Sequence, residues 1–126
     1  MTEDHVTLIV PAKPEYVRTV RMTASALASR TGMTYEEVED ARAAVDEAFV
    51  YAVSGADESD HVTVEFVLAD DVFGVEVRLG SGVSEDATQW AEAILGAYCD
   101  SHEFVSDAEG QRSLRLALRC RGVDDD

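Results

Sequence analysis

The segment that decides the fold is residues 34–55, which read TYEEVEDARAAVDEAFVYAVSG. Thr34 followed three residues later by Glu37 is a capping box, in which each side chain accepts a hydrogen bond from the other residue's backbone amide. Beyond this start, apolar residues recur at helical spacing: Val38, Ala41, Val45, Ala48 and Ala52. Gly55 is typical of the position just past a helix end. The pattern therefore predicts a long helix with one buried face.

A strand and another helix precede this segment. Residues 6–10, VTLIV, are apolar and rich in β-branched side chains, and they stop at Pro11, which is typical of a strand. Pro14 suits the first turn of a helix, which should end at Gly32. The apolar face of that helix is formed by Val17, Val20, Ala24 and Leu27. Two helices joined by a tight turn should lie antiparallel on the same sheet.

Two hairpins and a third helix follow. Apolar and polar residues alternate over 62–68 and 73–79, and a second pair of strands is predicted at 102–106 and 113–120. Residues 85–98 predict a helix that turns Trp90, Ile94 and Leu95 toward the core. The order predicts one α+β domain over residues 1–126, with an about five-stranded, mostly antiparallel sheet and the helices on one face. The expected core includes Val17, Leu27, Val45, Phe66, Val75, Ile94 and Leu116.

Composition restricts the possible functions. The 126 residues include 26 Asp and Glu against 10 Lys and Arg, which gives a formal net charge of −16. Nucleic acid is an unsuitable partner, because binding to phosphates needs a basic surface. No apolar run is long enough to span a membrane, and residues 1–5 lack the features of a signal peptide, so we expect a cytoplasmic protein. Cys99 and Cys120 lack metal-type spacing, and Cys99 with His102 has no second pair of ligands, so no metal site is expected.

Three stretches of the chain carry a family resemblance: residues 10–17 (VPAKPEYV), 28–40 (ASRTGMTYEEVED) and 44–48 (AVDEA). Together with the order of elements, they resemble the anti-sigma factor branch of the GHKL (Bergerat-fold) ATPases. Members of this branch are bacterial serine kinases that bind a sigma factor and phosphorylate an anti-anti-sigma protein. The resemblance implies a histidine-kinase-like ATPase fold and an RNA polymerase sigma factor as partner. It also implies an anti-anti-sigma factor of the STAS type as a second partner, and a homodimer.

The resemblance places the ATP site of the family on this sequence. The family's second helix carries a Glu that activates the attacking group and, four residues later, an Asn that holds Mg²⁺; these positions are Glu47 and Tyr51 here. A phenol does not replace an amide oxygen as a ligand for a small octahedral cation. The family's Asp-x-Gly-x-Gly motif corresponds to residues 78–82, RLGSG. Gly80 and Gly82 are kept, but Arg78 can only donate where the adenine amino group needs an acceptor.

The lid of the family's ATP site has no counterpart here. Only residues 83–87 lead from Gly82 into the part of the third helix around Trp90, and they contain no glycine pair that could cradle phosphates. Glu85 and Asp86 would repel a triphosphate at this helix start. We therefore expect Glu47 to be the remnant of a catalytic position, and we expect neither kinase activity nor ATP and Mg²⁺ as cofactors.

The outer side of the first helix is the expected partner surface, formed by Arg18, Arg21 and Ser25. Arg21 aligns with an arginine that, in this family, contacts the sigma factor and the anti-anti-sigma protein. A solvated arginine in weak salt bridges is the alternative. For the whole chain, an anti-sigma factor without kinase activity and an ATP-dependent serine kinase acting on an anti-anti-sigma factor both stay open. A third reading is that the altered pocket holds another small molecule.

Overall fold

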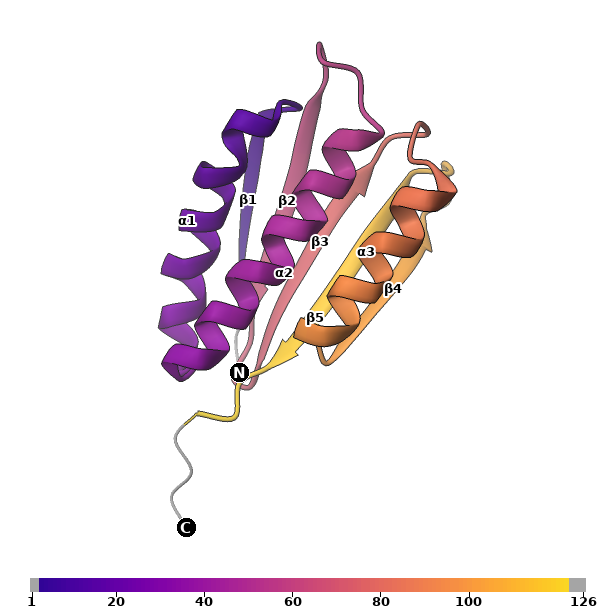
Figure 1. The fold of residues 1–126 in the computed structure, drawn as a ribbon. Helices are drawn as coiled ribbons and strands as arrows, with labels where there is room; N and C mark the ends of the chain where they lie inside the picture. The colour runs from indigo at the N-terminus through magenta and orange to yellow at the C-terminus, as the bar shows by residue number, and fades with distance from the viewer. Residues whose placement is uncertain (1–2, 123–126) are drawn as a thin grey trace.

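Within residues 3–122, the part that the computed structural model describes, five strands form one sheet and three α-helices cover one of its faces (Figure 1). The strands are β1 (Asp4–Pro11), β2 (His61–Leu68), β3 (Val72–Leu79), β4 (Ser101–Ser106) and β5 (Arg112–Arg119). Their order across the sheet is β1-β2-β3-β5-β4, and every neighbouring pair is antiparallel. The predicted α+β architecture is confirmed. The ends of the predicted 1–126 domain lie outside the described residues.

The helices are α1 (Val17–Ala28), α2 (Tyr35–Ser54) and α3 (Glu85–Tyr98). Pro14 starts a 3₁₀ turn, Pro14–Tyr16, that leads into α1, and a second 3₁₀ turn, Ser29–Thr31, follows α1. The predicted capping box is present: the Thr34 hydroxyl accepts from the Glu37 amide at 3.2 Å, and the Glu37 carboxylate accepts from the Thr34 amide at 2.9 Å. No helix in the described part of the chain is both long enough and apolar enough to span a membrane.

The core lies between the helices and the sheet. Four of the expected core residues, Val45, Phe66, Val75 and Leu116, are at most 1% exposed. The other three, Val17, Leu27 and Ile94, are only partly buried. They lie beside the innermost stripes of their helices, which consist of Val20, Ala24 and Ala28 on α1 and of Ala91 and Leu95 on α3.

Trp90 corrects one prediction, because it does not face the core. Its side chain is 68% exposed, whereas its neighbour Ala91 is fully buried. Successive helix residues are rotated by about 100°, so a helix that turns Ala91 and Leu95 toward the sheet must turn Trp90 toward its outer flank. A bulky aromatic residue at this position therefore lies on the surface.

Candidate functional site

Tyr51, at the family's Asn position, is built into the contact between α2, α3 and β4. Its side chain is 2% exposed, and its hydroxyl lies 2.7 Å from the Thr88 hydroxyl on α3. Thr88 donates its own proton to the Ser84 carbonyl at 2.8 Å, so the Tyr51 hydroxyl must be the donor between the two. The ring also meets Phe104 of β4 edge-on, with centroids 6.1 Å apart. Tyr51 therefore ties three elements together.

Glu47 lies one helical turn before Tyr51 and is only partly buried. Burial raises the pKa of its carboxyl group, and the neighbouring charge of Asp46 raises it further. Among residues 3–122, no hydrogen-bond donor or cation is paired with this carboxylate. Among the described residues, Glu47 is thus an acid without a partner at the outer side of α2.

The two glycines of the 78–82 stretch have a packing role. The Gly82 amide donates to the Gly55 carbonyl at the end of α2, at 3.2 Å. A β-carbon on Gly80 would lie 2.7 Å from that same oxygen, and one on Gly82 would lie 2.8 Å from it. Any larger residue at either position would push the loop away from α2. The loop between β3 and α3 therefore packs directly on the end of α2.

Arg78, at the end of β3, is exposed and lies opposite Ser113 in the sheet. It lines a hollow of about 250 Å³ near the end of α2, together with Ala52, Ala56, Asp60, His61, Val62, Thr63, Leu79, Gly80 and Gln111. Gly80 thus shares this hollow with Arg78, whereas Glu47, Tyr51 and Gly82 do not line it. Two of the five family ATP-site positions, Arg78 and Gly80, therefore line this hollow.

Arg21 of α1, a residue of the expected partner surface, is paired inside the chain with a carboxylate of α2. Its Nε donates to both carboxylate oxygens of Asp46 on α2, at 2.9 and 3.0 Å. This hydrogen bond and the charge of Asp46 raise the pKa of Arg21. Ser25 donates to the Arg21 carbonyl at 3.1 Å, and Arg18 is exposed. Asp46 was not among the predicted site residues, although it lies on the α2 segment that carries the resemblance.

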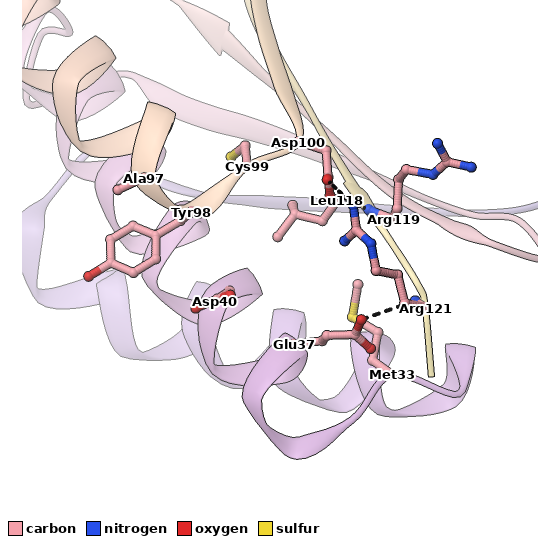
Figure 2. A pocket seen from close by; sticks show the side chains of 10 residues that line it. All are labelled: Met33, Glu37, Asp40, Ala97, Tyr98, Cys99, Asp100, Leu118, Arg119 and Arg121. Carbon is pink, nitrogen blue, oxygen red and sulfur yellow. Dashed lines mark hydrogen bonds and ion pairs between the residues drawn. The ribbon is translucent and has the colours of Figure 1, made fainter. Parts of the chain in front are cut away.

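A second hollow, of about 190 Å³, lies at the opposite end of α2 (Figure 2). Glu37 lies at its edge, and besides capping α2 it accepts from the backbone amides of Arg121 at 3.0 Å and Gly122 at 3.2 Å. The Arg121 side chain donates to Asp100 at 2.8 Å. Burial raises the pKa of the adjoining Cys99 thiol to about 12, so this thiol stays protonated at neutral pH. Glu37 therefore fixes the end of the described chain to the start of α2.

In the described part of the chain, no group of three or more His, Cys, Asp and Glu side chains is arranged to hold a metal ion. The residues at the family's Mg²⁺ and adenine positions are a phenol engaged with Thr88 and a guanidinium. Neither is the amide oxygen or the carboxylate oxygen that the family pattern places at these two positions.

Comparisons with known proteins identify relatives over almost the whole chain. Residues 10–118 match the family described as histidine kinase-like ATPase domain. The chain is 40% identical over 116 residues to the serine-protein kinase RsbW of Bacillus subtilis, covering 90% of this chain and 71% of that protein. It is 43% identical over 118 residues to the protein of the same name from Listeria monocytogenes serovar 1/2a, covering 91% and 71%.

A solved structure has the same fold. It contains the RsbU and RsbW domains of Rv1364c from Mycobacterium tuberculosis, with a TM-score of 0.71 and 21% sequence identity. The match covers 98% of this chain and 35% of that chain, so this chain spans about a third of that protein's length. At this level of identity the likeness concerns the fold alone.

Proposed function

The chain belongs to the family of histidine kinase-like ATPase domains, and we propose that it acts as an anti-sigma factor without kinase activity. In this proposal it binds an RNA polymerase sigma factor in the cytoplasm and withholds it from transcription. An anti-anti-sigma factor of the STAS type would release the sigma factor, and the protein would form a homodimer as its family does.

The observation that carries the proposal is the contact made by Tyr51. Its ring and hydroxyl occupy the space between α2, α3 and β4, where they are bound to Thr88 and packed on Phe104. To present an oxygen to Mg²⁺ from this position, the side chain would have to leave a buried site and break its hydrogen bond. A buried tyrosine whose hydroxyl has a hydrogen-bond partner stabilises the fold. This packing role of Tyr51 supports a loss of nucleotide binding.

The loop between β3 and α3 supports the same conclusion. It joins the two elements through residues 80–84 and is held on Gly55 by the Gly82 amide. α3 then starts with Ser84 as its cap and with Glu85 and Asp86 in its first turn. Negative charges at this helix start oppose the binding of phosphate groups.

The partner surface is proposed on α1, around Arg21. Asp46 uses only the Nε of Arg21. Within residues 3–122 the two terminal amino groups of the guanidinium have no hydrogen-bond partner, so both could meet a carboxylate of the sigma factor. Because Asp46 holds the guanidinium in place, less side-chain freedom is lost on binding. Arg18 and Ser25 lie on the same side of α1 and complete the surface.

Two measurements test this proposal. Titration of the protein with ATP and Mg²⁺ in a calorimeter should give no binding heat at physiological concentrations. The same titration of Bacillus subtilis RsbW is the positive control. A micromolar site would contradict the proposal. In a second measurement, Arg21→Ala should stay folded and bind the sigma factor about tenfold more weakly. Arg115→Ala, the same change on the opposite face of the sheet, is the matched control and should bind like the parent.

The second candidate is an ATP-dependent serine kinase that phosphorylates an anti-anti-sigma factor. The names of the relatives favour it, since the two relatives at 40% and 43% identity are both called serine-protein kinases. Glu47 also favours it, because this position keeps the family's acidic residue. Transfer of labelled phosphate from ATP to a serine of an anti-anti-sigma protein would establish this candidate, and Glu47→Gln should then abolish the transfer.

A further inference from the structure

α3 presents an apolar stripe to solvent, spaced at every fourth residue: Trp90, Ile94 and Tyr98. Trp90 is 68% exposed and Tyr98 is 39% exposed. The stripe lies on the flank of α3 that faces α2. Glu92, on the other flank, approaches His102 of β4 at 3.9 Å, whereas Tyr98 lines a hollow together with Asp40 of α2 (Figure 2).

The neighbouring part of α2 contributes Glu47 and Val50 to the same surface. α2 and α3 run antiparallel, since Tyr51 contacts Thr88 near one end and Asp40 adjoins Tyr98 near the other. Glu47 therefore lies level with the stretch between Trp90 and Ile94. Val50, which is 49% exposed, lies on the same outer side of α2 as Glu47. We call Glu47, Val50, Trp90, Ile94 and Tyr98 the α2–α3 surface.

The surroundings of this surface are strongly negative. α3 carries three acidic residues and no basic one, and α2 carries six acidic residues and only Arg42. Arg42 is paired with Glu39 at 2.8 Å. Burial also raises the pKa of Glu47, whose carboxylate has no cation beside it within the described residues. An apolar stripe with an unpaired, partly buried carboxylate at its centre is complementary to a ligand that is apolar and cationic at once.

We propose that the α2–α3 surface docks a cationic amphipathic helix of a partner protein. The apolar face of that helix packs on Trp90 and Ile94, and a Lys or Arg beside it pairs with Glu47. Trp is a frequent binding anchor because it buries a large area with few rotatable bonds. Helices that bind in this way place apolar anchors three or four residues apart, which matches the spacing of the stripe. The negative field of α2 and α3 would speed the approach of such a helix and exclude acidic ones.

This surface is distinct from the one proposed on α1. Arg21 meets Asp46 on the flank of α2 that faces α1, whereas Glu47 and Trp90 lie toward α3. The proposal therefore does not depend on the identity of the protein that binds α1, and it holds whether or not that protein is a sigma factor.

The test uses a synthetic amphipathic helix of leucine and lysine as the probe. Trp90 is the only tryptophan of the chain, so its emission should move to shorter wavelength when the probe covers it. Two further peptides are compared: one with the same composition in scrambled order, and one in which glutamate replaces lysine. Neither should bind with comparable strength. Binding of the scrambled peptide as tightly as the amphipathic one would overturn the proposal, because the acidic charge alone would then explain it.

Two variants with the same charge change locate the contact. Glu47→Gln should weaken binding of the fluorescein-labelled probe about tenfold, because it removes the central carboxylate. Glu92→Gln removes a charge from the flank of α3 that faces β4 and should leave the affinity nearly unchanged. Trp90→Ala, followed by anisotropy of the labelled probe, should also weaken binding, with far-UV circular dichroism as the check on folding. Equal effects of Glu47→Gln and Glu92→Gln, or an unmoved Trp90 emission at saturation, would refute the proposal.

Discussion

Replacing Tyr51 by alanine should cost about 3–5 kcal/mol of the free energy of unfolding. A buried aromatic side chain removes about 150–250 Å² from water, and at about 25 cal/mol per Å² this amounts to about 4–6 kcal/mol, part of which the alanine methyl retains. Tyr51→Phe keeps the ring and loses only the hydrogen bond to Thr88. Because the Thr88 hydroxyl still donates to Ser84, no buried donor is left unpaired, and we expect a loss of about 0.5–1.5 kcal/mol.

The assay is urea unfolding followed by far-UV circular dichroism, with the slope of the free energy against urea checked in each variant. Tyr35→Ala is the matched control, because Tyr35 is 79% exposed, and it should change stability by no more than about 0.5 kcal/mol. If Tyr51→Ala lost less than about 1 kcal/mol, far below the usual cost of truncating a buried aromatic residue, the ring would not hold α2, α3 and β4 together. The main support for the proposed loss of nucleotide binding would then fall.

Three further predictions concern stability. Gly82→Ala should destabilise the fold by about 1–3 kcal/mol, since its β-carbon would meet the Gly55 carbonyl at 2.8 Å; a stable variant in urea unfolding would contradict that close approach. Gly96→Ala, on α3 with open space around it, should gain about 0.5–1 kcal/mol in the same assay. Burial raises the pKa of Glu37, but hydrogen bonds from backbone amides, that of Thr34 first, outweigh it and hold the pKa below its usual 4.5. The contribution of this carboxylate to the free energy of unfolding is therefore fully present above pH 4.5, and it is lost as the pH falls through the lowered pKa of Glu37. Thermal unfolding should show Glu37→Gln less stable than the parent at pH 7 and close to it in acid, and a gap independent of pH would show that the carboxylate charge plays no part.

The elements of the fold could be predicted from the sequence because their signals are local. The capping box at Thr34 and Glu37, and the alternation over 62–68 and 73–79, each depend on residues a few positions apart. Both predicted hairpin pairings, β2 with β3 and β4 with β5, are present. Two other pairings, β1 with β2 and β3 with β5, were not predicted, because each joins segments far apart in the chain.

Burial was predicted less well at the flanks of the helices. The periodicity of α3 is compatible with more than one rotation about its axis, and the large apolar Trp90 was assigned to the core by its residue type. The structure shows that Ala91 and Leu95 face the sheet. Small residues let a helix approach a sheet closely, and this leaves the tryptophan at the side, where it becomes part of the α2–α3 surface.

The sequence by itself determined which segments form helices and strands, and it identified Tyr51 and Arg78 as departures from the family pattern. Only the tertiary structure decided which side chains meet: Tyr51 with Thr88, Arg21 with Asp46, and Glu37 with the amides of Arg121 and Gly122. The physical reason is that the backbone conformation of a residue depends mainly on residues a few positions away in the sequence. The partner of a side chain depends instead on how whole helices lie on the sheet, which is set by the packing of the entire core.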